Sequence, residues 1–365
     1  FRSLPDIAPR TKPKALMMAL PFARGDLLVV YDAEDRPGRG QLREAAETFA
    51  AGPQTLGCLQ APLSIHNAEQ NWLTRFFAAE YDALFRVVLP ALARYGLPIP
   101  LGGTSNHFRV EALKQAGGWD PFNVTEDADL GVRLALAGWQ VGTIATPTLE
   151  EAPPLLKRWL GQRGRWFKGW LQTMAVLGRR PVTLARALGP KGLLGLLATL
   201  VGSIGSALIH LPTLVPLLAW SAVEGLPPFA SLAMIVLLTG YGASMACQAV
   251  GLVRGGHAGI IPWLALVPGL WVIAGIAAMR AVHELATRPF HWEKTTHGLS
   301  HGFAPPPDRS RALALLQEQA PMAVERGHDP AVIAEVIARH RALAAAADVV
   351  AADVVAIKSD QLPYR

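Results

Sequence analysis

The sequence predicts an α/β domain followed by membrane helices and a helical tail, and three observations lead to this fold class. The first 150 residues alternate short apolar runs with helix-like stretches, an order typical of α/β folds. The 365-residue chain is 51% hydrophobic with a mean hydropathy of +0.26, and the apolar excess lies between residues 193 and 279. Residues 304–365 contain two alanine-rich helical patterns, and no catalytic or binding motif is recognised in them.

The expected elements of the α/β domain follow one another along the chain. Residues 26–31 form a continuous apolar run of the kind found in a buried parallel strand, and an acidic turn follows it. Further strands are expected at 55–60, at 106–110 and, last, at 140–144. Helices are expected at 40–51, 70–93 and 111–116, and from Thr125 to Gly138.

Two apolar segments have the length and composition of transmembrane helices. Residues 192–220 and 229–253 carry no charged side chain, and each can cross about 30 Å of hydrocarbon. A third segment, 259–279, is also uncharged but contains Pro262 and Pro268. Two spans return the chain to the cytoplasm near Arg254, so the positive-inside rule favours a re-entrant or interfacial third segment over a third span.

The basic character of the chain is concentrated just before the first apolar segment. Net charge is +6 and the isoelectric point is near 9.5. Residues 155–191 contain nine basic side chains and no acidic one, as the positive-inside rule expects of a cytoplasmic flank. This position argues against a nucleic-acid partner. The two cysteines, Cys58 and Cys247, provide no disulfide framework and fit a reducing compartment.

Two acidic motifs are candidates for catalysis. Asp32, Glu34 and Asp35 follow the first strand, and carboxylates at a strand end suit Mg²⁺ or Mn²⁺ bound to a diphosphate; taken alone, the cluster is also typical of a solvated turn. Glu126 and Asp127 begin a helix, where Thr125 is a favoured N-cap and acids complement the helix dipole. The alternative is that Asp127 is a general base that removes the proton of an acceptor hydroxyl.

A basic, aromatic motif follows the α/β domain. Gln162, Arg165 and Trp166 stand at i, i+3 and i+4 on one face of an expected helix, where a guanidinium can bind phosphate and an indole can stack on a sugar ring. An amphipathic helix lying on anionic lipid explains the same residues, and the two interpretations are compatible. Residues 291–298 form a polar, aromatic run whose simplest explanation is a juxtamembrane anchor.

In this order, the motifs resemble those of the processive family-two glycosyltransferases, which include cellulose synthase and hyaluronan synthase. The resemblance covers about residues 11–302 and rests on TKPKAL at 11–16, YDAEDRP at 31–37, GGTSN at 102–106, TED at 125–127 and QRGRW at 162–166. It implies a partial GT-A (Rossmann-like) domain and an inverting hexosyl transfer from a nucleotide-sugar, expected to be a UDP-sugar. The implied acceptor is a growing β-glycan, in polysaccharide synthesis.

The resemblance also implies roles for individual residues. It makes Asp127 the catalytic base and assigns the metal, Mg²⁺ or Mn²⁺, to Asp32 and Glu34, with Asp35 as the alternative because Glu34 replaces the family's second aspartate. Substrate contacts are expected from the remaining motif residues: Lys14, Thr104, Glu126, Gln162, Arg163, Arg165, Trp166, Lys294 and Thr295. Lys294 and Thr295 belong to a run that is similar to the cytoplasmic gating loop of cellulose synthase.

These expectations divide the chain into five parts. They are a partial GT-A domain (1–150), interface helices (151–191), a membrane region (192–285), a gating-like loop (286–303) and the helical tail (304–365). We expect a multi-pass protein of the inner membrane with a cytoplasmic catalytic domain, in contact with membrane lipids. The family's earlier strands do not precede Phe1, so the chain is expected to be part of a longer enzyme. Transfer of a single sugar to a lipid, and glycan binding without catalysis, remain as alternatives.

Overall fold

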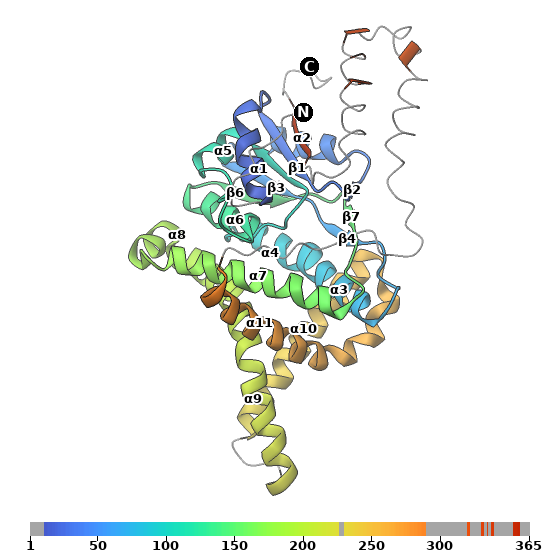
Figure 1. Ribbon diagram of the computed structural model, residues 1–365, viewed down its shortest axis with the longest axis vertical. Coiled ribbons are helices and arrows are strands. Elements are labelled where there is room, and N and C mark those ends of the chain that lie inside the picture. The colour runs from blue at the N-terminus through green and yellow to red at the C-terminus, as the bar shows by residue number, and fades with distance from the viewer. Residues whose placement is uncertain are drawn as a thin grey trace.

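The structure, a computed structural model, describes residues 11–225, 230–289 and 353–357, with isolated residues between 320 and 338. Figure 1 shows a domain of strands and helices above, a long helix α7 crossing beneath it, and further helices below. The expected gating-like loop, with Lys294 and Thr295, and nearly all of the expected helical tail lie outside the described residues.

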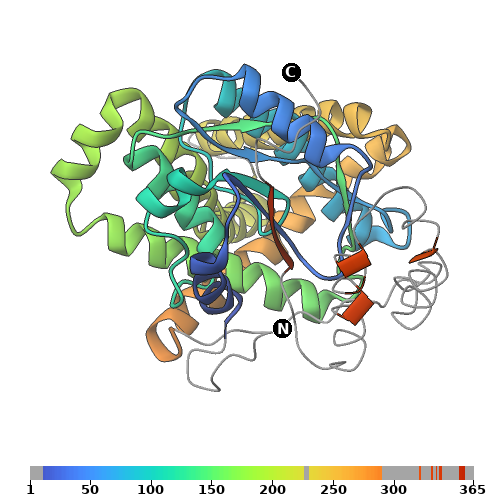
Figure 2. The ribbon, with the colours of Figure 1, turned by 90° about the horizontal axis from the view of Figure 1, so that it is seen from above.

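A five-stranded sheet forms the centre of the upper domain, in the order β6-β3-β5-β1-β8. Its strands are β1 (Leu27–Tyr31), β3 (Leu56–Gln60), β5 (Asn106–Arg109), β6 (Gln140–Thr143) and β8 (Asp353–Ile357). β1 is buried as its apolar run predicts, but the expectation of a parallel strand is wrong for the described residues, because β1 pairs antiparallel with both β5 and β8 (Figure 2). Only the β3–β6 pair of this sheet is parallel.

A second, three-stranded sheet was not expected from the sequence. It contains β2 (Arg36–Pro37), β7 (Thr148–Glu150) and β4 (Leu63–Ile65), in the order β2-β7-β4. Residues 140–144 are therefore not the last strand, because β7 follows them. Strands of two or three residues are too short for the alternation of apolar and polar positions to be visible. This sheet brings residues 31–37 next to residues 148–150.

The helices of the upper domain lie close to their expected positions. They are α1 (Lys12–Ala19), α2 (Gln41–Ala51), α3 (Trp72–Ala83), α4 (Leu89–Arg94), α5 (Val110–Gln115) and α6 (Glu126–Leu136). α3 begins with a capping box in which Asn71 accepts from the Leu73 and Thr74 amides and the Thr74 hydroxyl accepts from the Asn71 amide. A single π-helical turn, Leu84–Val88, joins α3 to α4, and such turns frequently occur at functional sites.

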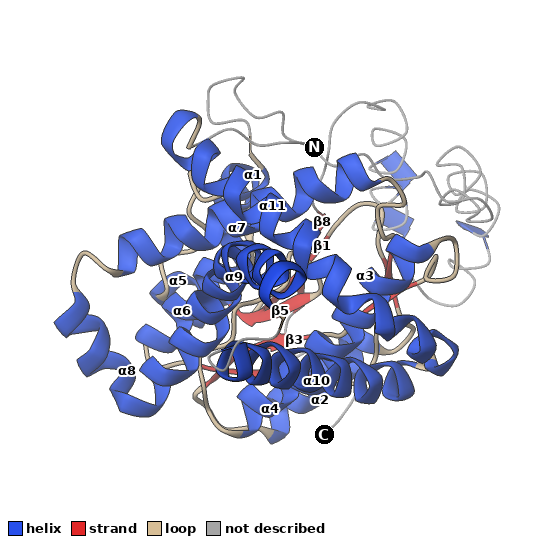
Figure 3. Cartoon of the chain, turned by 90° about the horizontal axis from the view of Figure 1, so that it is seen from below, coloured by secondary structure: helices blue, strands red, loops and turns tan. Residues whose placement is uncertain are grey.

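The remaining helices connect this domain to the apolar segments. They are α7 (Leu156–Leu177), α8 (Pro181–Leu196), a π-turn (Leu197–Val201), α9 (Gly202–Glu224), α10 (Ala230–Gly255), the 3₁₀ helix η4 (Ala258–Leu266) and α11 (Val267–Thr287). Three stretches are long and apolar enough to cross a membrane: Pro181–Glu224, Leu232–Gly255 and Ala258–Thr287. α9 runs along the long axis of the molecule, whereas α11 crosses it (Figures 1 and 3).

α7 and α11 lie side by side and run in the same direction. Lys168 Nζ lies 3.3 Å from Glu284 Oε2, and Gln172 Nε2 donates to the Pro289 carbonyl at 2.9 Å. Both members of the Lys168–Glu284 ion pair are buried. One hydrophobic core contains side chains from α3, α7, α9 and α11, so the α/β domain and the apolar helices are packed as one body.

Candidate active site

A pocket of about 170 Å³, lined by both charged and aromatic side chains, lies where the end of β1 faces the start of α6 and one side of α7. Several stretches that are distant in the sequence supply its lining. The sequence-predicted site residues among them are Asp32, Thr104, Glu126, Asp127, Gln162, Arg165 and Trp166. The structure therefore brings together the acidic turn, the GGTSN loop, the TED motif and the QRGRW helix, which the sequence only places in order.

Asp32 follows the C-terminal end of β1, where a backbone hydrogen bond and a lysine hold it in place. The Asp32 amide donates to Thr104 Oγ1 at 3.0 Å, and Lys12 Nζ forms an ion pair with the Asp32 carboxylate. Lys12 Nζ also donates to the Gly103 carbonyl at 2.6 Å. Burial lowers the pKa of Lys12, but the carboxylates of Asp32 and Glu126 outweigh this effect and raise that pKa above its ordinary value. Lys12 is therefore a fixed positive charge in the pocket.

The other two acids of the turn lie in different surroundings. The Glu34 side chain is exposed, whereas Asp35 Oδ2 is buried and has no hydrogen-bond partner among the described residues. Burial, followed by the charge of Asp32, raises the pKa of Asp35 to about 8. Asp35 is thus half-buried close to Asp32, whereas Glu34 faces the solvent.

A further carboxylate, Glu150 at the end of β7, lines the same pocket. Its Oε1 accepts from the Tyr81 hydroxyl at 3.4 Å, and its Oε2 is buried with no partner among the described residues. Burial, and then the charge of Asp35, raise the pKa of Glu150 well above its usual range. Two buried carboxylate oxygens without partners, on Asp35 and Glu150, carry a cost that a cation relieves.

These carboxylates fit a particular kind of metal site. The described residues contain no group of three or more side chains placed to hold an ion by themselves. Mg²⁺ and Mn²⁺ sites in phosphate-handling enzymes typically use one or two carboxylates, and phosphate oxygens of the substrate complete the coordination. Asp32 and Asp35 meet this requirement, with Glu150 beside them.

Asp127 lies in the first turn of α6, and its side chain is half-buried. Its Oδ1 accepts from the Ala128 amide at 2.8 Å. Burial raises the pKa of Asp127, and the Ala128 hydrogen bond and the charges of Lys12 and Arg165 oppose that rise. Burial, and then the charge of Asp127, raise the pKa of neighbouring Glu126 to about 8. A carboxylate with a raised pKa is better matched to proton abstraction near neutral pH than an exposed aspartate.

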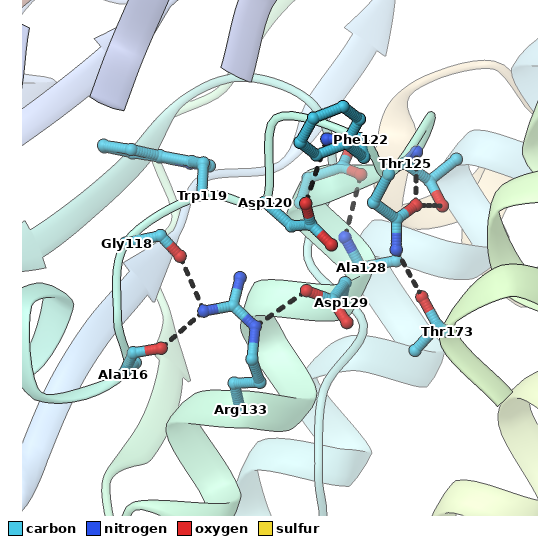
Figure 4. Close-up of polar contacts among 12 residues, drawn as sticks. Ala116, Gly118, Trp119, Asp120, Phe122, Thr125, Ala128, Asp129, Arg133 and Thr173 are labelled. Atoms are coloured by element: carbon cyan, nitrogen blue, oxygen red, sulfur yellow. Dashed lines mark hydrogen bonds and ion pairs between the residues drawn. The ribbon is translucent and has the colours of Figure 1, made fainter. Parts of the chain in front are cut away.

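The loop before α6 is fixed by hydrogen bonds from its neighbours. Arg133 forms an ion pair with Asp129 and donates to the Gly118 carbonyl at 2.6 Å, which ties α6 to the preceding loop (Figure 4). Asn123 Nδ2 donates to Thr173 Oγ1 of α7 at 2.9 Å. α6 begins where the sequence predicts, with Thr125 at the N-cap position, but the Thr125 side chain makes no capping hydrogen bond to α6.

α7 presents the expected face to the pocket. Arg165 Nη1 donates to the Val124 carbonyl at 3.2 Å, directly before the TED motif. Gln162 is buried, and its Oε1 has no hydrogen-bond partner among the described residues. The Trp166 ring lies 6.1 Å from the Phe77 ring and 6.3 Å from the Tyr81 ring, so α3 supports it from behind. A cation, an amide and an indole thus face the pocket from one helix.

Arg163 and Lys14 do not line the pocket. Arg163 Nη2 lies 2.5 Å from Glu80 Oε2, and its guanidinium lies against the Trp159 and Trp166 rings at 4.9 and 4.7 Å. Its guanidinium thus packs against Trp166, which lines the pocket, and Arg163 itself does not line it. Lys12 takes the place expected of Lys14, because side chains two positions apart on a helix point in different directions.

Sequence reasoning missed Lys12, Tyr81 and Glu150 as pocket residues. For Lys12 the signal was present, since it belongs to the motif at 11–16 from which Lys14 was chosen. Tyr81 stands in the middle of a long helix, and Glu150 in a strand of three residues, where no local pattern distinguishes them. Only the packing of α3 and of the second sheet against the first brings them to the site.

Fold, apolar helices and ordered motifs together define a GT-A-type domain joined to helices that are long and apolar enough to cross a membrane. Residues 27–247 match the family model described as glycosyl transferase family group 2, and the chain belongs to that family. The match covers more than half of the chain. Its bounds include the acidic motifs, the QRGRW helix and most of the two long apolar helices.

Curated relatives match over a shorter stretch. A beta-monoglucosyldiacylglycerol synthase of Synechocystis sp. is 33% identical over 168 residues, which is 44% of this chain and 33% of that protein. A glucomannan 4-beta-mannosyltransferase of Cyamopsis tetragonoloba is 29% identical over 145 residues, 40% of this chain and 27% of that protein. The matched region thus spans about a third of the length of these relatives.

A solved structure also resembles this chain. It is a mannosyltransferase from Pyrobaculum calidifontis in complex with GDP-Man and Mn²⁺, with 21% identity and a TM-score of 0.39, covering 72% of this chain and 67% of that one.

Proposed function

We propose that this chain is the catalytic and membrane-associated part of an inverting hexosyltransferase that takes its sugar from a nucleotide-sugar. Family membership supports sugar transfer. The observation that carries the mechanism is that Asp127, Asp32 and Arg165 line one pocket although the chain separates them widely. A base, an acidic metal site and a guanidinium around one cavity are what a single displacement at an anomeric carbon requires.

In this mechanism Asp127 accepts the proton of the acceptor hydroxyl as the hydroxyl oxygen attacks the anomeric carbon. Arg165 and Lys12 stabilise the negative charge that develops on the departing nucleoside diphosphate. Gln162 and Trp166 orient the sugar and the acceptor. Asp32 and Asp35 would hold Mg²⁺ or Mn²⁺ together with the donor phosphates, and the ion would supply further neutralisation of that charge.

We also propose an arrangement in the membrane. The hairpin of α9 and α10 crosses the bilayer, and α7 lies at its cytoplasmic surface beneath the catalytic domain. The proposal that the third apolar segment is interfacial or re-entrant draws support from α11, which runs beside α7 and crosses α9 (Figure 3). The five-part division at residues 150, 191, 285 and 303, and the inner membrane as location, remain part of this proposal.

Two candidate functions differ in the acceptor of the sugar. A processive enzyme of the cellulose or hyaluronan synthase type would extend a β-glycan, and the ordered motifs support it. An enzyme that glycosylates a lipid would share every motif, and the similarity to a monoglucosyldiacylglycerol synthase supports it. The donor sugar, expected as a UDP-sugar, is also a proposal.

Asp127→Asn tests the mechanism directly. The substitution keeps the shape of the side chain but removes the base, so turnover should fall by about 10²- to 10⁴-fold while calorimetric binding of UDP with Mn²⁺ is unchanged. Glu47→Gln on α2 is the matched control, because Glu47 is exposed and does not line the pocket, so the rate should stay near that of the wild type. An Asn variant that keeps more than about a tenth of the wild-type rate would show that Asp127 is not the base.

A further inference from the structure

A second cavity, larger than the pocket described above and mainly apolar, lies between the α/β domain and the apolar helices. Its volume is about 410 Å³, within the range of ligand sites in proteins. The π-turn Leu84–Val88 and α4 form its upper wall, and α7 forms one side. The π-turn Leu197–Val201 and helices α9, α10 and α11 form the remainder. Apolar side chains from each of these groups line it, among them Leu89, Phe167, Leu200 and Leu270.

The cavity and the catalytic pocket meet at two shared side chains. Leu84, the first residue of the π-turn, and Trp170 of α7 line both spaces. On one side of these residues lie Asp127, Arg165 and Glu150, and on the other lie hydrocarbon walls. A molecule that fits both spaces has a polar end that bears the reacting group and an apolar body.

The surroundings of the cavity are suited to a lipid. The helices that form its lower part expose apolar side chains outward: Ile209 and Leu218 of α9, and Leu232 and Leu238 of α10, are each at least 60% exposed. Contiguous apolar surface of this extent on α9 and α10, two of the stretches with the length and composition of membrane spans, indicates contact with hydrocarbon. The cavity therefore lies among helices that lipid surrounds.

One buried polar group in the cavity indicates a ligand rather than empty space. Gln248 of α10 lines the cavity and is 6% exposed; its Nε2 donates to Ser244 Oγ at 3.0 Å, but its Oε1 has no partner among the described residues. A buried amide oxygen without a donor is costly, and a ligand hydroxyl would relieve that cost. The other polar side chains of the lining already have partners within the protein: Glu80 pairs with Arg163, Thr199 and Ser203 donate to backbone carbonyls, and Ser244 accepts from Gln248. A glycan chain would therefore leave most of its hydroxyls unpaired there.

We propose that this cavity holds the hydrocarbon part of a lipid acceptor whose free hydroxyl reaches Asp127 past Leu84 and Trp170. The inference rests on the proposed sugar transfer and names the acceptor class for that same site. The hydroxyl oxygen bonds to the anomeric carbon, and its proton moves to the Asp127 carboxylate. The bond from that carbon to the diphosphate breaks, and its electron pair leaves with the nucleoside diphosphate.

Ser203→Phe tests the proposal by filling the cavity from α9, and Ser206→Phe is its matched control. Both serines donate to carbonyls of their own helix, but Ser203 lines the cavity whereas Ser206 faces outward. The full chain in membranes is given radiolabelled UDP-glucose or GDP-mannose with Mn²⁺ and 1,2-dioleoylglycerol. Two products are measured: glycosylated lipid, and free sugar formed by hydrolysis of the donor.

We expect Ser203→Phe to lower kcat/KM for dioleoylglycerol by about tenfold or more, the loss that follows when roughly two methylene groups lose their apolar surroundings. Donor hydrolysis should be unchanged, because water needs no cavity, and Ser206→Phe should match the wild type in both assays. Dihexanoylglycerol, whose chains are shorter, should discriminate less between the variants. If Ser203→Phe also loses hydrolysis, Ala198→Phe, at an exposed cavity position, takes its place.

The outcomes separate the two proposals. A wild-type chain that neither hydrolyses nor transfers either donor would contradict the proposed function itself. Donor turnover with equal lipid kinetics in Ser203→Phe, Ala198→Phe and Ser206→Phe would overturn the lipid site alone. Formation of an alkali-insoluble polymer, with no chloroform-soluble product, would overturn it in favour of a glycan acceptor.

Discussion

Gly169→Ala is the substitution for which the structure gives the sharpest expectation. Gly169 of α7 lies against Thr125, immediately before Glu126 and Asp127. An added methyl carbon would lie 2.7 Å from Thr125 Cγ2 and 2.8 Å from Thr125 Cβ. Ordinary carbon contacts are about 3.5–4.0 Å, so the start of α6 must move by about 1 Å relative to α7.

That displacement predicts two measurable losses. Overpacking of this kind typically costs about 1–3 kcal/mol of unfolding free energy. A shift of about 1 Å between the proposed base on α6 and the proposed phosphate-binding residue Arg165 on α7 can lower the rate on the order of 10²-fold. Thermal unfolding in detergent and steady-state donor turnover measure the two effects separately, and we expect kcat to fall more than the affinity for UDP.

A second substitution makes the reasoning refutable. Thr125→Gly removes every atom of the clash, and glycine at an N-cap position costs only a few tenths of a kcal/mol. The double variant should therefore regain most of the lost rate and stability, giving a favourable coupling in a double-mutant cycle. Gly205→Ala on α9, where nothing lies within 4 Å of the added methyl, is the control. Wild-type rate and stability in Gly169→Ala, or no recovery in an otherwise active double variant, would refute the close approach.

Two further predictions concern the charges of the pocket. Lys12→Met removes a cation that lowers the pKa of Asp127, so that pKa should rise and the acid limb of the pH–rate profile should move to higher pH. Lys14→Met is the control and should leave the acid limb in place. An acid limb that does not move in Lys12→Met would contradict the role of Asp127 as the base. Glu150→Gln removes a carboxylate beside Asp35, so the Mn²⁺ concentration for half-maximal rate should increase severalfold. Glu151→Gln is the control and should not change that concentration. The same Mn²⁺ concentration for half-maximal rate in Glu150→Gln and in the wild type would exclude Glu150 from the metal environment.

The positions of most helices and strands could be predicted from the sequence, but the direction of strand pairing could not. The run at β1 indicates burial on both faces, and that burial is observed, whereas the same run is equally compatible with parallel and antiparallel neighbours. Helices such as α2 and α6 begin and end within about two residues of expectation, since their periodicity and glycine boundaries are local signals.

The candidate site was predictable to the extent that its residues belong to ordered motifs. Asp32, Asp127, Gln162 and Arg165 carry such signals and line one pocket. The structure changes the details that depend on helical phase or on distant packing. Lys12 replaces Lys14 because of its position on α1, and Arg163 turns away because Glu80, 83 residues earlier, provides its partner.

α7 explains why the catalytic and membrane parts form one unit. Residues 155–191 contain no acid, so any ion pair to a cation of α7 must come from another element. α3 supplies Glu80 to Arg163, and α11 supplies Glu284 to Lys168, a pair that is buried on both sides. Removing one partner of a buried pair is strongly destabilising. The helix that carries Gln162, Arg165 and Trp166 is therefore held in place from the α/β domain and from the apolar helices together, and the pocket depends on both.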